Sequence, residues 1–92
     1  MQVFNLKEMN LEERANVFYE TDEFNSRIIT LPSGGKIPPC DMDSYVLFYV
    51  ISGQVKVTVE GEEETLKEQE CLITDPATLS MKTEKGAKVL GL

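Results

Sequence analysis

Cys40 carries a thiol, and a thiolate is both a nucleophile and a soft metal ligand. Activation of a thiol needs a nearby base or cation, and the chain contains no histidine. Lys36 and Arg27 are the nearest cations along the sequence. Asp41 and Asp43 flank the cysteine with negative charge, which disfavours a thiolate. The sequence therefore does not favour a nucleophilic or redox role for Cys40.

The residues that follow Cys40 predict a sulfur-containing, apolar strand face. Side chains at every second position of a strand point the same way. Positions 40, 42 and 46 therefore share a face that continues through Phe48 and Val50. Beyond a predicted turn, alternating valines extend the same interior: Val55, Val57 and Val59. We expect these side chains to line the inside of a β-structure.

The opposite face of this segment is also apolar, since it carries Tyr45, Leu47, Tyr49 and Ile51. Such a surface is too apolar to be left in water. The flank of a second sheet, the N-terminal segment or another subunit must cover it. Because symmetric dimers are common and a 92-residue chain has a small core, we expect a homodimer that uses this face.

From Phe24 onward the sequence predicts short strands separated by turns. The predicted strands are Ser26–Leu31, Tyr45–Ile51, Val55–Glu60, Glu64–Leu66, Cys71–Thr74, Leu79–Lys82 and Lys88–Leu92. Tight turns are predicted at Ser52-Gly53-Gln54 and Gly61-Glu62, and Pro38-Pro39 keeps the chain extended before the longest apolar strand. Many short strands at close spacing predict an all-β sandwich or small barrel.

The first 25 residues carry weaker signals. Val3–Leu6 predicts a short strand, and Asn10 followed by Glu13 has the outline of a helix cap, which predicts helical turns over 11–16. No repeat, low-complexity segment or linker interrupts the chain. We therefore expect a single domain over residues 1–92, with its barrel core in 26–92.

Composition narrows the partners and the compartment. A formal net charge of −7 argues against a nucleic-acid partner, because phosphate binding needs a basic patch. The longest apolar run, Val46–Ile51, is too short to span a bilayer, and no signal-peptide pattern opens the sequence. We expect a cytoplasmic protein with reduced thiols, although a single Cys40–Cys71 bridge stays open.

The stretch from Gly34 to Gly53 resembles the first motif of the cupin family. That motif runs glycine, five residues, His-x-His, three or four residues, glutamate, six residues and glycine. Here the same spacing joins Gly34, Cys40-Asp41-Met42, Val46 and Gly53. The glycines and the strand between them match, whereas the histidines and the glutamate are replaced.

The second cupin motif, built around a proline and a third histidine, is similar to Glu70–Met81. Pro76 stands at its proline, Thr78 replaces a glycine, and Met81 falls where the third histidine belongs. The resemblance covers roughly residues 26–92. It implies a small antiparallel β-barrel of the double-stranded β-helix, or jelly-roll, type.

The resemblance also indicates which metal chemistry this chain lacks. Metal-dependent cupins generally hold iron, manganese, nickel or zinc with three imidazoles and a carboxylate. The matching positions here are Cys40, Met42, Val46 and Met81. Valine cannot ligate a metal, and these metals favour oxygen and nitrogen donors, so an iron- or manganese-dependent dioxygenase or isomerase is not expected.

Three functions remain open for such a barrel. The expected one is a degenerate, non-catalytic cupin without a cofactor, whose apolar interior is packed with adaptable sulfur side chains or holds a small molecule. Its pocket candidates are Cys40, Met42, Val46, Phe48, Val57 and Met81. The second is a Cu(I)-binding module, because the Cys40 thiolate and the Met42 and Met81 thioethers are soft ligands. The third is a metal-free cupin enzyme of isomerase or epimerase type that acts through Tyr49 or Cys40, although such enzymes normally show a histidine or a paired acid and base.

Overall fold

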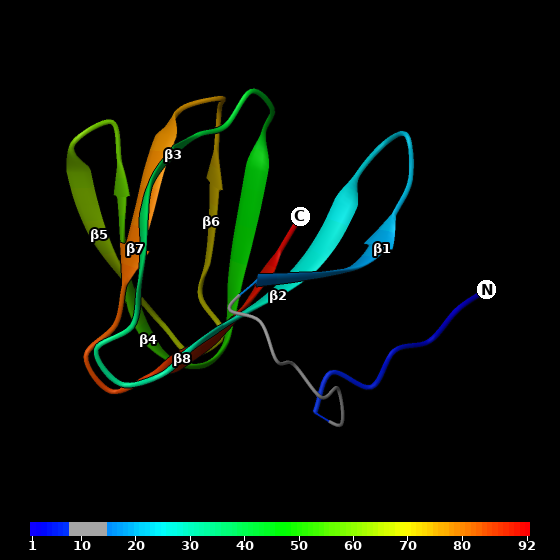
Figure 1. Cartoon of the computed structure of the whole chain (residues 1–92), viewed down its shortest axis with the longest axis horizontal. Coiled ribbons are helices and arrows are strands. Elements are labelled where there is room, and N and C mark those ends of the chain that lie inside the picture. Colours follow the sequence, from blue (N-terminus) through cyan, green and yellow to red (C-terminus); the bar gives the residue numbers. More distant parts are fainter. Residues whose placement is uncertain (8–14) are drawn as a thin grey trace.

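The computed structural model describes residues 1–7 and 15–92, and the regular elements in these ranges are all β-strands (Figure 1). The strands are β1 (Ala15–Glu20), β2 (Asn25–Leu31), β3 (Lys36–Asp41), β4 (Val46–Val59), β5 (Glu62–Lys67), β6 (Cys71–Thr74), β7 (Thr78–Lys82) and β8 (Ala87–Gly91). Each pairs antiparallel with its neighbours. The all-β antiparallel architecture expected from the sequence is therefore confirmed. No candidate membrane-spanning helix occurs in this described part of the chain.

Strand β4 joins two sheets because each of its halves has different partners. Its first half pairs with β6 and β8, and its second half pairs with β5 and β7. Strands β2 and β1 extend the first sheet beyond β8, and β3 lies beside β7 in the second, giving the order β1-β2-β8-β4-β7-β3. The sheets curl toward each other into an open half-barrel, from which the β1–β2 hairpin projects (Figure 1).

The predicted turn at Ser52-Gly53-Gln54 is wrong, because β4 continues through it as one strand. The chain bends there instead, with a register shift between Val50 and Ser52 and a positive φ of 81° at Gly53. A Cβ at Gly53 would lie 2.3 Å from the Gly86 carbonyl oxygen, so a side chain cannot be accommodated without a shift of the backbone. The bend moves β4 from one sheet to the other and forms the corner of the barrel.

The core lies between the two sheets and is made of alternate residues of the strands. Val50, Val55, Val57 and Val89 are almost completely buried. They belong to a continuous cluster that also contains Ile29, Leu31, Val46, Phe48, Leu66, Leu79, Met81 and Ala87. The inward positions change from even to odd between Val50 and Val55, because the irregular segment at the bend shifts the alternation. One end of the barrel is therefore tightly packed.

The structure does not confirm the predictions for the N-terminal residues. Val3–Leu6 is not a strand, because no neighbouring strand in the described residues offers it hydrogen bonds. The predicted helix over 11–16 falls mainly outside the described residues. Its last two positions, 15 and 16, begin strand β1, where pairing with β2 outweighs the local helix-cap pattern.

The N-terminal segment touches the outer face of the first sheet at β8. Lys88, on the outer face of β8, donates a hydrogen bond from Nζ to the Leu6 carbonyl. Ile28 is completely buried although it lies outside the core cluster, on the opposite side of β2 from Ile29. Farther along the same outer face, Ile73 of β6 is 67% exposed. The outer face of β6 is therefore open to solvent at this residue.

Candidate functional site

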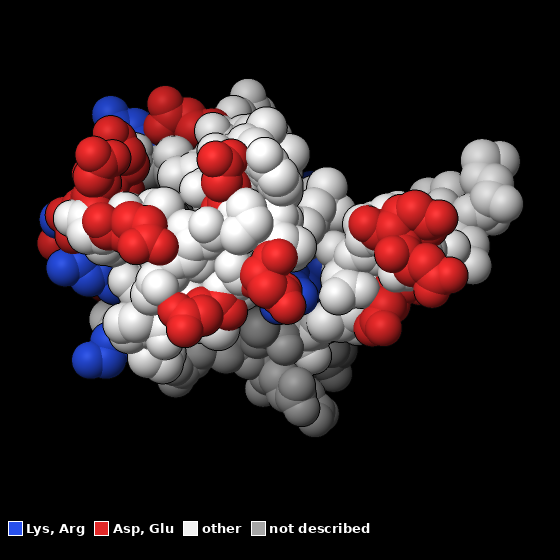
Figure 2. Space-filling model, turned by 90° about the horizontal axis from the view of Figure 1, so that it is seen from above, with Lys and Arg blue, Asp and Glu red and all other residues white. Residues whose placement is uncertain are grey.

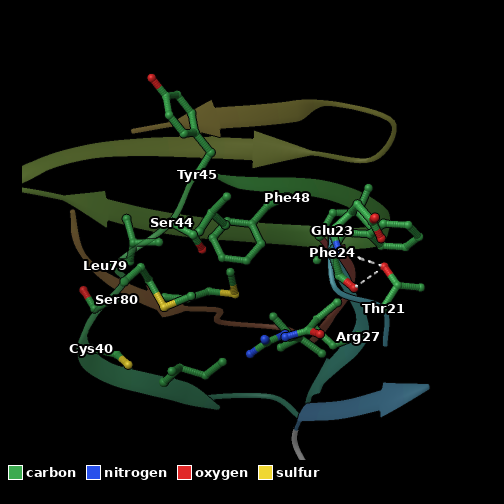
Figure 3. Close-up of a pocket in the computed structure, with 18 of the residues that line it drawn as sticks. Thr21, Glu23, Phe24, Arg27, Cys40, Ser44, Tyr45, Phe48, Leu79 and Ser80 are labelled. Atoms are coloured by element: carbon green, nitrogen blue, oxygen red, sulfur yellow. Dashed lines mark hydrogen bonds between the residues drawn. The ribbon is translucent and has the colours of Figure 1, made fainter. Parts of the chain in front are cut away.

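A cavity of about 490 Å³ opens at the end of the barrel opposite the packed core. Its walls come from the inner faces of β2, β8 and β4 on one side and of β3 and β7 on the other. The β1–β2 turn and the β3–β4 connection form its mouth (Figure 3). Pockets of this size are typical of small-molecule sites.

Five of the six candidate pocket residues line this one cavity: Cys40, Met42, Val46, Phe48 and Met81. Val57 does not line it. It lies beyond the bend of β4, opposite Met81 in the ladder with β7, and is completely buried in the core. The cavity therefore lies beside the first half of β4, and the second half of that strand contributes to the packed core.

A bulge in β3 brings Cys40 to the cavity. Ile37 pairs with Met81 and Cys40 pairs with Leu79, so β3 has one residue more than β7 between these pairs. Ile37 and Cys40 therefore both line the cavity despite their odd spacing. The extra residue falls at Pro38-Pro39, which an edge strand tolerates because the missing N–H groups need no partner there.

Two hydrogen bonds join the residues that follow Cys40 to the start of β7. The Thr78 hydroxyl donates to the Asp41 carboxylate over 2.5 Å, and the Met42 amide donates to the Ala77 carbonyl over 2.9 Å. Asp41 and the adjacent wall residue Met42 are thereby tied to the neighbouring segment. Cys40 and Met42 are presented to the cavity by a strand with little freedom to shift.

Arg27 is the positively charged side chain of the cavity wall. It occupies the same face of β2 as the core residues Ile29 and Leu31, and it is half-buried. Figure 3 shows its side chain projecting from β2 into the cavity, on the side opposite Cys40. The sequence named Arg27 among the nearest cations to Cys40, but its inward position was missed. The alternation Arg27-x-Ile29-x-Leu31 was the signal that could have revealed it.

Gly91 makes room for the Arg27 side chain. It stands between Arg27 of β2 and Phe48 of β4 in the same cross-strand row. A Cβ there would lie 3.1 Å from Arg27 Cγ and 3.4 Å from Phe48 Cε1. The missing side chain lets the arginine stem and the aromatic ring pack over the glycine, and the guanidinium extends beyond them.

The mouth of the cavity is acidic. Asp22 and Glu23 line it from the β1–β2 turn. Thr21 shapes this turn: its Oγ1 accepts hydrogen bonds from the amides of Glu23 and Phe24, each over 3.1 Å (Figure 3). Figure 2 shows acidic side chains on the projecting lobe and over much of the visible face, in keeping with the net charge of −7.

The cavity does not fit the usual metal centre of the barrel family that the sequence resembles. Val46 stands at the carboxylate position, and the chain has no histidine. Among the described residues, no three His, Cys, Asp or Glu side chains gather closely enough to hold a metal ion. The remaining donors are the exposed thiol of Cys40, the half-buried Met42 and the buried Met81.

Two other candidates from the sequence lie away from the cavity. Tyr49 does not line it, since its neighbours in β4, Phe48 and Val50, take the inward positions. Cys71 pairs with Tyr49 across β4 and β6 and is exposed. Both cysteines are free, so the Cys40–Cys71 bridge left open by the sequence is not formed.

Comparison with known proteins gives matches in structure but not in sequence. No protein-family profile and no curated protein matches this chain. The cupin domain of Cnp3 from Schizosaccharomyces pombe is 17% identical, with a TM-score of 0.86 over 97% of this chain and 70% of that one. An RmlC-like cupin protein from Desulfovibrio desulfuricans is 16% identical, with a TM-score of 0.86 over 99% and 93% of the two chains.

A third similar structure is a cupin-2 domain protein from Shewanella frigidimarina. It is 14% identical, with a TM-score of 0.78 over 97% of this chain and 91% of that one. Identities this low establish shared architecture and leave the chemistry of the site to be argued from its own residues. The chain has the cupin fold.

Proposed function

We propose that this protein is a small-molecule-binding cupin domain, which holds its ligand by shape and by its own side chains and not through a histidine-bound metal. The observation that carries the proposal is the cavity of about 490 Å³ between the two sheets, in which Cys40, Met42, Phe48, Met81 and Arg27 meet. Cores of small domains rarely retain voids larger than a water molecule. A space of this size, open to solvent and walled mainly by apolar groups, suits a small organic ligand.

The side chains of the wall support binding more than catalysis. Cys40, Met42, Phe48 and Met81 provide polarisable and aromatic surface, which adapts to the shape of a ligand. A proton-transfer enzyme needs an acid and a base held within reach of the substrate. The carboxylates that line the cavity, Asp22 and Glu23, stand in the turn at its mouth.

The proposal can be tested with protein labelled with ¹³C at the methionine methyl groups. Titration with 3-phenylpropanoate and with its neutral amide, 3-phenylpropanamide, should shift the signals of Met42 and Met81 and leave that of the exposed Met1 in place. Met42→Leu and Met81→Leu variants assign the two signals. Absence of a shift with either probe at millimolar concentration would contradict the proposal.

A blocked form provides the matched control. In a Cys71→Ser variant, Cys40 is the remaining cysteine and is accessible to N-ethylmaleimide. The adduct would fill the cavity from the β3 wall, so the methionine shifts on titration should disappear. Unchanged titration curves after complete alkylation would place binding elsewhere and count against the cavity.

Cu(I) binding is the second candidate function, and one observation favours it. Cys40 and Met42, which lie two residues apart, and Met81, which is distant in the sequence, line the same cavity. A thiolate with two thioethers is a soft donor set suited to Cu(I). Anaerobic titration against a coloured Cu(I) chelator should then show transfer of one copper ion to the wild type and none to Met42→Leu/Met81→Leu. Retention of the chelator colour by the wild type would exclude it.

A further inference from the structure

We propose that the cavity takes a small organic monocarboxylate, whose carboxylate pairs with Arg27 and whose apolar body lies against Phe48 and the two methionines. This inference rests on the proposed function, and it adds the chemical class of the ligand. It is carried by the position and the environment of a single guanidinium.

Arg27 has no counterion among the residues that the structure describes. In residues 1–7 and 15–92, the ion pair present is Lys82–Glu63, at 3.6 Å, and it involves neither Arg27 nor the cavity. The Arg27 side chain also makes no hydrogen bond within the described part of the chain. A half-buried guanidinium therefore presents all five of its N–H donors to the cavity and its water.

The apolar walls around Arg27 strengthen its attraction for a bound anion relative to the same pair at the surface. The Arg27 stem and the Phe48 ring both flank the space above Gly91, and the rest of the lining includes Ile29, Met42 and Met81. Water is partly excluded from such a place, so a charge-assisted hydrogen bond is stronger there than on the outside of the protein. The planar guanidinium matches the two oxygens of a carboxylate.

The charge around the mouth indicates a single negative charge on the ligand. Asp22 and Glu23 line the mouth, and the whole chain carries a net charge of −7. Arg27 compensates one negative charge, whereas a second one would face the acidic turn without a partner. A phosphate dianion or a dicarboxylate is therefore disfavoured relative to a monocarboxylate with the same body.

The apolar part of the ligand follows from the opposite wall. Ile37 and Cys40 of β3 and Leu79 and Met81 of β7 offer no charge to a bound molecule. A phenyl or short alkyl group placed there would exchange water for contacts with these side chains. The two requirements, one carboxylate and one apolar group, meet in aryl- or alkyl-substituted short-chain acids.

Isothermal titration calorimetry with three matched probes tests this assignment. The probes are 3-phenylpropanoate, its neutral amide, and benzylmalonate, which has the same body and a second carboxylate. The proteins are the wild type, Arg27→Gln, and Lys67→Gln as a control with the same change of charge on an exposed residue outside the cavity. Arg27→Met, which keeps an apolar stem over Gly91, is the second variant in case the glutamine variant folds poorly.

The expected result is that the wild type and Lys67→Gln bind 3-phenylpropanoate about tenfold or more tightly than the amide. Both Arg27 variants should lose this preference and keep the affinity for the amide. Equal affinities for acid and amide in the wild type, or a preference that survives in both Arg27 variants, would overturn the carboxylate assignment and leave the proposed function standing. Tighter binding of benzylmalonate would overturn the restriction to one charge. Binding of none of the three probes would overturn both proposals.

Discussion

Arg27 and Phe48 meet over Gly91, the residue that lies between them in the row of strands β2, β8 and β4. Arg27 Cγ and Phe48 Cε1 lie 3.1 and 3.4 Å from the position that a Cβ on Gly91 would take. A charged side chain is thereby held on the core-facing side of a strand, beside the cavity.

Substitution of Gly91 should weaken the binding of 3-phenylpropanoate although the charge of Arg27 is kept. Gly91→Val would push the Arg27 stem and the Phe48 ring apart, since both are already at contact distance. We expect the affinity for 3-phenylpropanoate to fall by about tenfold. The same change in an Arg27→Gln background should have little further effect, because neighbouring residues that act together are not additive. Additive losses in calorimetry would contradict the coupling.

The corner of β4 should tolerate no side chain at Gly53. Gly53→Ala places a Cβ against the Gly86 backbone at 2.3 Å and strains a φ of 81°. We expect a loss of more than about 3 kcal/mol in the free energy of unfolding. Gly61→Ala is the control, because its φ is 85° but the space around it is open, so it should lose about 1 to 2 kcal/mol. Equal shifts in the urea midpoints would mean that the contact with Gly86 is unimportant.

Val57 should behave as a core residue and not as a ligand contact. Val57→Ala removes two methyl groups from a completely buried position, and we expect it to destabilise the fold by about 2 kcal/mol. Probe affinity, measured at a temperature where the variant is folded, should stay the same. Val17→Ala, at a site that is 50% exposed, should change stability by about 0.5 kcal/mol or less. A selective loss of binding in Val57→Ala would place this residue in the site.

The two cysteines should differ in their response to a ligand. Cys40 and Cys71 are both exposed and free, but Cys40 lines the cavity and Cys71 lies on the outer face of β6. Saturation with 3-phenylpropanoate should slow alkylation of Cys40 by iodoacetamide and leave the rate at Cys71 unchanged, as followed by mass spectrometry of the digested protein. Equal protection of both thiols, or of neither, would contradict binding in this cavity.

We also propose the homodimer expected from the outer apolar face. Ile73 of β6 is 67% exposed beside Leu47 of β4, on the outer face of the first sheet. Light scattering after size exclusion should give twice the mass of 10.4 kDa for the wild type. Ile73→Lys should reduce it to the monomer, and Val3→Lys, an equally drastic change at an 88% exposed site, should not. A monomeric wild type would refute the proposal.

The strand content and the inward set of β4 could be predicted from the sequence, because the pattern of apolar residues and turn residues is local. Cys71–Thr74 was predicted with its observed bounds. The bounds predicted for β2, β5, β7 and β8 lie within two residues of the observed ones, and two predicted strands, Tyr45–Ile51 and Val55–Glu60, are the two halves of β4. The resemblance of Gly34–Gly53 to the cupin motif also implied the fold that the structure has. These features depend on residues close together in the chain.

Tertiary structure decided what the local pattern could not. A glycine after a long strand predicts a turn, but the Gly86 backbone packed against Gly53 makes it the corner of a continuous strand. Ala15–Glu20 became a strand because β2 offered it hydrogen bonds. Above all, Arg27 and Cys40 are joined in one cavity by the curl of two sheets and by a bulge at two prolines. The sequence alone could determine which face of its own strand each residue occupies, whereas only the packing of the sheets decided which of those faces meet.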